Sequence, residues 1–83
     1  EEILLKPMEF DLLVMLAKNK NIALSRERLL HGVWGVDYQG ETRTVDVHIQ
    51  RLRAKIESDP AQPQLLCTVR GLGYRLVAPL TAS

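Results

Sequence analysis

Four side chains between residues 43 and 51 have types and spacings suited to reading the edges of DNA bases. Arg51 could donate two hydrogen bonds to a guanine, and Gln50 could pair through two bonds with an adenine. On a helical wheel Val47 points in the same direction as Arg43, Gln50 and Arg51, where a solvated face usually carries a long polar residue. An apolar side chain among guanidinium and amide groups suits contact with thymine methyl groups. We interpret this face as base-reading, with a solvated basic helix as the alternative.

The opposite face of the same segment predicts how it is held. Apolar residues recur at spacings of four, three and four, which is the pattern of an amphipathic helix that buries one side. They are Val45, Ile49, Leu52 and Ile56. We therefore predict a helix over residues 43–58 that packs this stripe against a core and presents its basic side outward.

Other residue types that could support catalysis or bind metal lack partners at suggestive spacings. His31 has no second ligand nearby, and Cys67 has no His or Asn placed to activate it. Asp46 lies on the flank of the predicted helix, and we expect it to pair with Gln50 or Arg53 rather than to act in catalysis. The sequence therefore predicts neither an enzyme nor a bound metal or cofactor.

Length and composition indicate one small domain. A chain of 83 residues can bury one modest core without disulfides, and its single cysteine cannot form one internally. The apolar runs are too short to span a bilayer and no signal peptide is recognisable, so we expect a cytoplasmic protein with no membrane contact. The chain starts at Glu1 rather than at Met, and we expect it to be part of a longer protein.

Charge is distributed unevenly although the net value is only +1. Residues 1–41 hold five basic and seven acidic groups, which gives −2, whereas residues 42–83 hold six basic and three acidic groups, which gives +3. Five of those six basic residues are arginine, whose planar guanidinium suits phosphates and guanine edges. The second half of the chain therefore has the charge of a nucleic-acid-binding surface.

Two further helices precede the basic one. Pro7 fits the first position of a helix over residues 7–19, and Ser25 is a good N-cap for a helix over residues 25–34. Thr42 is the natural N-cap of the third helix, after a loop over residues 36–41, and Thr44 is the other candidate. The first helix is expected to bury a stripe widened on both sides, made of Phe10, Leu12, Leu13, Val14, Met15, Leu16 and Ala17. Phe10 is expected in the core.

Both ends of the chain are predicted to add β-structure. Residues 2–5 form a short apolar run that we interpret as a strand, which is too short to be stable unless it pairs with another segment. Residues 65–77 hold two β-rich runs around a Gly-Leu-Gly sequence, which predicts a hairpin rather than a nucleotide-binding loop. Alternation does not decide which hairpin face meets the helices, although Tyr74 is expected in the core. Residues 78–83 are predicted to be a tail.

Strand, three helices and hairpin in this order describe an α+β winged helix-turn-helix. Four segments, KPMEFDLL, LSRERLLHGVWG, RTVDVHIQRLRAKIE and TVRGLGYRL, closely resemble the winged-helix output domain of OmpR/PhoB-type bacterial response regulators. The resemblance covers about residues 4–77, and the last two motifs at this separation are highly specific. It implies sequence-specific binding of double-stranded DNA for transcription regulation.

The resemblance also assigns roles to individual residues. It places the third helix in the major groove, with Val47, Gln50 and Arg51 reading bases, and the hairpin tip in the minor groove through Arg70. A narrow, A·T-rich groove would attract such an arginine. The residues that resemble phosphate contacts are Trp34, Arg43, Thr44, His48, Arg53 and Thr68. The loop that corresponds to a segment able to touch RNA polymerase consists of Val36, Asp37, Tyr38, Gln39, Gly40 and Glu41.

Partners follow from the same resemblance. Family members bind direct repeats as head-to-tail pairs, so two copies per site are expected, and a receiver domain is expected in the full-length protein. Three features depart from the family pattern. Lys6 stands where a capping Thr or Ser is frequent, and Gln50 replaces a frequent basic residue, which favours an adenine contact over phosphate attraction. Residues 1–5 would be only a remnant of the small N-terminal sheet with which the family's domain opens. The alternative function is a winged-helix protein-interaction module whose basic helix is only solvated.

Overall fold

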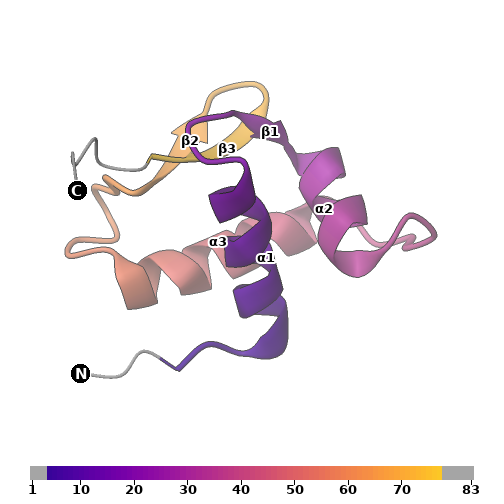
Figure 1. Cartoon of the computed structure of the whole chain (residues 1–83), viewed down its shortest axis with the longest axis horizontal. Helices are drawn as coiled ribbons and strands as arrows, with labels where there is room; N and C mark the ends of the chain where they lie inside the picture. Colours follow the sequence, from indigo (N-terminus) through magenta and orange to yellow (C-terminus); the bar gives the residue numbers. More distant parts are fainter. Residues whose placement is uncertain (1–3, 78–83) are drawn as a thin grey trace.

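Residues 4–77 are described by the computed structural model, in which three helices enclose a hydrophobic core beside a small sheet (Figure 1). The helices are α1 (Pro7–Lys18), α2 (Arg26–Trp34) and α3 (Arg43–Ile56). The strands are β1 (Leu24–Ser25), β2 (Leu66–Val69) and β3 (Gly73–Leu76). The predicted helices and hairpin are confirmed, although α3 ends at Ile56 rather than near residue 58.

The sheet is antiparallel, with β3 in the middle and the order β1-β3-β2. The β2–β3 turn closes through a hydrogen bond from the Leu72 N–H to the Val69 carbonyl (2.9 Å). Gly71 in this turn has a φ of 78°, which favours glycine. Gly73 is required for a different reason, because a Cβ there would collide with the carbonyl oxygen of Leu24 on β1.

The third strand of the sheet is not the one predicted. Leu4 and Leu5 are not in a strand, and β1 pairs with β3 instead through Leu24 and Tyr74. The prediction of a strand over residues 2–5 is therefore wrong at Leu4 and Leu5, the part of that segment that the structure describes. The edge of β3 is instead paired with β1, which precedes it by some fifty residues in sequence. Residues 1–3 and the predicted tail, 78–83, lie outside the described residues.

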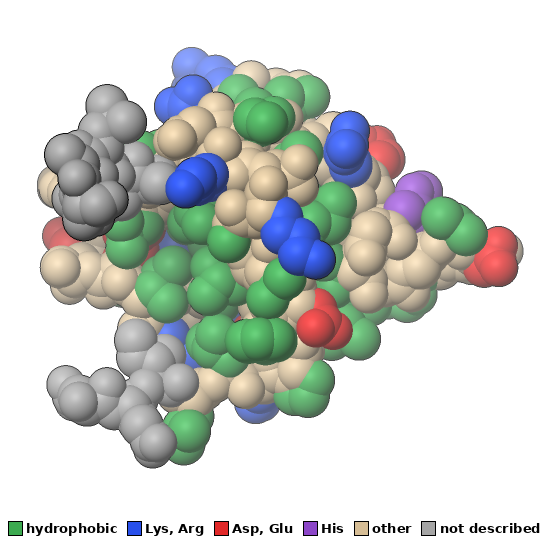
Figure 2. Space-filling view, in the orientation of Figure 1, with side chains coloured by type: hydrophobic (Ala, Val, Ile, Leu, Met, Phe, Trp, Pro, Cys, Tyr) green, Lys and Arg blue, Asp and Glu red, His purple; other side chains and the backbone are tan. Residues whose placement is uncertain are grey.

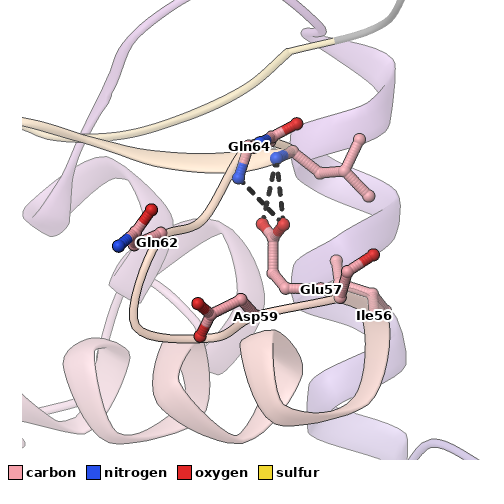
Figure 3. Close-up of a pocket in the computed structure, with 7 residues that line it drawn as sticks. Ile56, Glu57, Asp59, Gln62 and Gln64 are labelled. Carbon is pink, nitrogen blue, oxygen red and sulfur yellow. Dashed lines mark hydrogen bonds between the residues drawn. The ribbon is translucent and has the colours of Figure 1, made fainter.

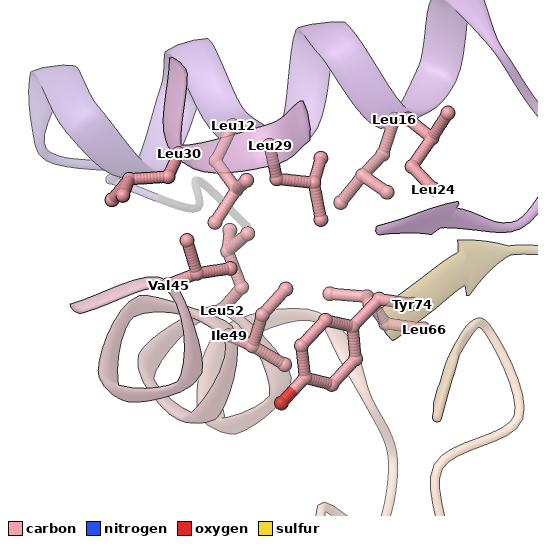
Figure 4. Close-up of a cluster of buried hydrophobic side chains, with 10 residues drawn as sticks. All are labelled: Leu12, Leu16, Leu24, Leu29, Leu30, Val45, Ile49, Leu52, Leu66 and Tyr74. Carbon is pink, nitrogen blue, oxygen red and sulfur yellow. The ribbon is translucent and has the colours of Figure 1, made fainter. Parts of the chain in front are cut away.

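The core lies between α1, α2, α3 and one face of the sheet (Figure 4). The predicted stripe of α3 is confirmed, since Val45, Ile49 and Leu52 are fully buried and Ile56 packs at the edge. Leu66 is fully buried, which identifies the hairpin face that meets the helices. The buried apolar residues are Leu12, Leu16, Leu24, Leu29, Leu30, Val45, Ile49, Leu52, Leu66 and Tyr74.

Helix α1 buries only part of the predicted stripe. Phe10 is 55% exposed and Ala17 is also exposed, whereas Leu12 and Leu16 are fully buried. Apolar residues surround much of this helix, so periodicity alone does not select the buried side. The face that is buried includes Glu9, which is 1% exposed and forms an ion pair with Lys55 of α3 (2.6 Å). The buried face of α1 therefore includes a charged residue whose partner lies on α3.

The helix starts agree only partly with the predicted caps. The Ser25 hydroxyl accepts a hydrogen bond from the Arg28 N–H (3.0 Å), as expected for an N-cap. Lys6 offers no side-chain acceptor, but its own N–H donates to Glu9 Oε1 (3.1 Å). Thr42 is the N-cap residue of α3, as predicted, although its side chain makes no cap hydrogen bond. None of the helices within residues 4–77 is long and apolar enough to cross a membrane.

Candidate nucleic-acid interface

The outward face of α3 is exposed to solvent. Arg43, Gln50, Arg51 and Ala54 are exposed, and Val47 is 42% exposed among them. In the part of the chain that the structure describes, no hydrogen bond or ion pair engages the side chains of Arg43, Gln50 or Arg51. Three groups able to donate to bases or phosphates therefore surround one apolar side chain on a helix whose other face is fixed in the core.

One flank of this face is built from aromatic residues at the junction of α2 and α3. The His48 Nδ1–H donates to the Thr44 carbonyl (2.8 Å), and because a carbonyl can only accept, the proton is on Nδ1. The His48 ring meets Trp34 edge-on, with centroids 4.9 Å apart. Trp34 also packs against the core. Three predicted phosphate contacts, Trp34, Thr44 and His48, are thus brought together.

Two other predicted phosphate contacts are engaged with each other. Arg53 is only 6% exposed; its Nε donates to the Leu66 carbonyl (2.9 Å) and its Nη2 donates to the Thr68 hydroxyl (2.8 Å). Its guanidinium also lies over the Tyr74 ring, 5.5 Å from the centroid. Arg53 therefore connects α3 to the hairpin, whereas Thr68 is exposed on β2.

The partners predicted for Asp46 are wrong. Asp46 Oδ1 accepts hydrogen bonds from Arg26 Nε (2.8 Å) and from the Tyr74 hydroxyl (2.6 Å), rather than from Gln50 or Arg53. Burial and the bond to this carboxylate raise the pKa of the Tyr74 phenol above its usual value. The sequence carries no local signal for this cluster, because its members lie 20 and 28 residues from Asp46.

The carboxylate of Glu57, the C-cap residue of α3, binds the backbone at the start of the hairpin. Glu57, at the C-terminal end of the helix, points toward the segment that leads into β2 (Figure 3). Its two oxygens accept from the N–H groups of Gln64, Leu65 and Leu66 at 2.7–3.2 Å. Burial disfavours its charge, but these backbone bonds outweigh that effect, and the pKa of Glu57 is lowered. At the other end of β2, Arg70 is exposed in the turn.

The loop between α2 and α3 projects at one end of the molecule, where Figure 2 shows acidic and hydrophobic side chains. All six residues from 36 to 41 are exposed, and Val36 is 79% exposed. The Tyr38 ring packs over Gly40 and lies 6.3 Å from Trp34, centroid to centroid. Within residues 4–77, no group of three or more His, Cys, Asp or Glu side chains is placed to hold a metal ion.

Comparison with known proteins identifies the family. Residues 1–76 match the family model described as "Transcriptional regulatory protein, C terminal". The chain belongs to this family. Sensory transduction protein RegX3 of Mycobacterium leprae is 60% identical over 68 residues, which covers 82% of this chain and 34% of that protein. The chain thus spans about a third of the length of such relatives.

Solved structures of the family share the fold. The Klebsiella pneumoniae RstA DNA-binding domain, crystallised in complex with the RstA box, aligns with a TM-score of 0.82 and 38% identity over 93% of this chain and 76% of that one. Response regulator DrrB of Thermotoga maritima, described as an OmpR/PhoB homolog, aligns with a TM-score of 0.84 and 37% identity over 92% of this chain and 34% of that one. Membership confirms the OmpR/PhoB resemblance and the winged-helix fold, and the family consists of transcription regulators rather than enzymes.

Proposed function

We propose that this chain binds double-stranded DNA in a sequence-specific manner and regulates transcription as the output domain of a cytoplasmic two-component response regulator. The observation that carries the proposal is the face of α3, where Arg43, Gln50 and Arg51 are exposed and unpaired around Val47. A buried stripe on the opposite side holds this face outward. The DNA complex of the RstA relative supports the same use of the fold.

In this proposal α3 enters the major groove and each neighbouring element has a separate task. Val47, Gln50 and Arg51 read base edges, while Arg43 and the flank of Trp34, Thr44 and His48 bind phosphates. Thr68 is exposed although it lies on the strand face that meets α3, and it offers its hydroxyl to a phosphate while Arg53 donates to the same oxygen.

The hairpin and the interhelical loop extend the proposed interface beyond α3. Arg70 enters the adjacent minor groove, where a narrow A·T-rich segment has the negative potential that attracts arginine. The exposed loop over residues 36–41 is proposed to contact RNA polymerase, since its apolar and acidic side chains are unlike a phosphate-binding surface. A receiver domain in the rest of the protein is proposed to control the output domain, and two copies are proposed to bind each direct-repeat site.

Salt dependence of binding tests this proposal against a protein-interaction module. Affinity for a duplex selected from a random pool should fall with salt with a log–log slope of about −0.9 for each phosphate neutralised. Arg43→Ala should flatten that slope by about one phosphate, on selected and random DNA alike. Binding to duplex DNA that is absent at low salt, or that is indifferent to salt, would favour the protein-interaction module instead.

A further inference from the structure

Tyr74 of β3 lies at the meeting point of the sheet, α2 and α3. Only 5% of the residue is exposed, and the guanidinium groups of Arg26 and Arg53 each lie 5.5 Å from the centroid of its ring. Its hydroxyl donates to Asp46 Oδ1, which also accepts from Arg26. The buried tyrosine is thus in contact with one cation from α2 and with one cation and one anion from α3.

These contacts attach α3 to the hairpin near both ends of the helix. Asp46 belongs to the first turn of α3 and Arg53 to its last turn. Asp46 contacts β3 through Tyr74, whereas Arg53 contacts β2 through the Leu66 carbonyl and the Thr68 hydroxyl. Charge-assisted hydrogen bonds are directional and stronger than neutral ones, so they define an orientation that apolar packing alone would leave less specific.

The hairpin needs such an attachment. Strands β2 and β3 are four residues each, and an isolated two-stranded hairpin of this kind is marginally stable in water. On its other edge β3 pairs with the two residues of β1, and the Asn21 N–H donates to the Leu76 carbonyl (2.7 Å). The direction in which the β2–β3 turn and Arg70 project therefore depends on how β3 is held against the helices.

We infer that four side chains position the hairpin relative to α3 and thereby determine how much Arg70 contributes to the preference for A·T-rich flanking DNA. We call these positioning residues the Tyr74 cluster, which consists of Tyr74, Asp46, Arg26 and Arg53. The inference rests on the proposed function. It predicts that the cluster influences a part of the DNA that none of its members needs to touch.

A double-mutant cycle between Tyr74→Phe and Arg70→Ala tests the inference. Tyr74→Phe keeps the buried ring and removes only the hydroxyl that reaches Asp46. The readout is the flank ratio, which is the Kd for a duplex with G·C-rich flanks divided by the Kd for a duplex with A·T-rich flanks. Both duplexes share the selected major-groove site. Tyr74→Phe should lower this ratio by about twofold or more, in the range of coupling within one hydrogen-bonded network. In the Arg70→Ala background it should change the ratio no further.

Two further variants separate positioning from loss of stability. Asp46→Asn removes the charge of the acceptor and should lower the flank ratio in the same direction as Tyr74→Phe. Leu12→Val removes a methylene from the buried face of α1, a helix that contributes no residue to the Tyr74 cluster, and should lower thermal stability while leaving the flank ratio unchanged.

The outcomes separate the inference from the proposed function. If Arg70→Ala abolishes the flank preference and Tyr74→Phe leaves it intact, the positioning role is overturned and the proposed function stands. Effects of the two substitutions that multiply in the double variant also overturn the positioning role. If the unsubstituted chain binds DNA without any flank preference, the minor-groove contact fails and the inference fails with it.

Discussion

Arginine has two distinct tasks in this domain, and exposure distinguishes them. Arg43, Arg51 and Arg70 are exposed, and their guanidinium groups have no partner among the described residues. Arg53 is almost fully buried and Arg26 is partly buried, and both bond to the protein itself. The same fork of donors that can read guanine thus also ties a helix to a carbonyl and a hydroxyl. Substitutions at the two kinds of site should therefore fail in different assays.

Replacement of Arg51 by alanine is expected to weaken binding to the selected site by about 1–3 kcal/mol and to relax the preference at one or two base pairs. The reason is the loss of a bidentate contact that only one base can satisfy. Kd values for single-base variants of the duplex give the measurement. Arg75→Ala, which removes an exposed arginine from β3, is the matched control for lost charge. Equal losses on selected and random DNA would refute base reading by Arg51.

Replacement of Arg53 by alanine is expected to act first on stability. The Leu66 carbonyl and the Thr68 hydroxyl both lose a donor, which should lower the free energy of unfolding by about 1–3 kcal/mol. Urea denaturation gives the measurement. Arg53→Lys should remain destabilised, because one ammonium cannot reproduce the two bonds of the planar fork. An unchanged urea midpoint together with a flattened salt slope would instead show a direct phosphate contact.

At the scale of elements, α1 and α3 are joined by an ion pair inside the helical layer. Glu9 is buried and Lys55 is partly exposed, with 2.6 Å between Oε1 and Nζ. The hydrogen bond from Lys55 lowers the pKa of Glu9 below its ordinary value of 4.5, and this effect outweighs burial, which raises it. A carboxyl whose pKa is lowered by folding stabilises the native state above the unfolded pKa. That contribution is lost as pH falls through the folded pKa.

Glu9→Gln is therefore expected to lower stability at neutral pH and to reduce the further loss between about pH 5 and pH 3. Glu57 has a lowered pKa as well, so part of the acid loss should remain. Urea midpoints across this range give the measurement, and Glu27→Gln, at an exposed position in the first turn of α2, is the matched control. An acid profile of Glu9→Gln parallel to that of the parent chain would contradict a role for Glu9 ionisation.

Sequence patterns predicted the elements that are determined locally. The stripe of α3 repeats with the helical period, Ser25 caps α2, and Gly71 allows the tight turn of the hairpin. Each of these signals lies within a few residues of the structure it predicts. The outward face of α3 could be predicted for the same reason, because the exposed side of a helix follows once its buried side is known.

Features that depend on distant partners were not predictable in this way. Leu24–Ser25 is a strand because it pairs with β3. Asp46 accepts hydrogen bonds from Arg26 and Tyr74, which are distant in sequence, rather than from residues close to it. The buried face of α1 depends on Lys55, which compensates the charge of Glu9. The guanidinium of Arg53 is a group that commonly binds phosphate. It is buried here because the hairpin packs against α3 and supplies its hydrogen-bond acceptors.

At the scale of the whole molecule, the proposed DNA contacts belong to one copy, and direct repeats would arrange successive copies head to tail. We expect the free 9.4 kDa chain to sediment as a monomer and to form a complex of two copies on a duplex with two direct half-sites. A duplex with one half-site should bind one copy. Inserting about five base pairs between the half-sites turns the second copy to the opposite side of the helix, and any cooperativity between copies should be lost.

The orientation of the two half-sites distinguishes a head-to-tail pair of copies from a two-fold symmetric pair. If the copies contact each other in a head-to-tail manner, inverting one half-site removes cooperativity even when the spacing is preserved, since the surfaces that met are no longer opposed. Sedimentation velocity at matched protein and duplex concentrations resolves the one-copy and two-copy complexes. Cooperative binding that is stronger on the inverted repeat would contradict the head-to-tail arrangement and would indicate a two-fold symmetric pair, while leaving base reading by α3 intact.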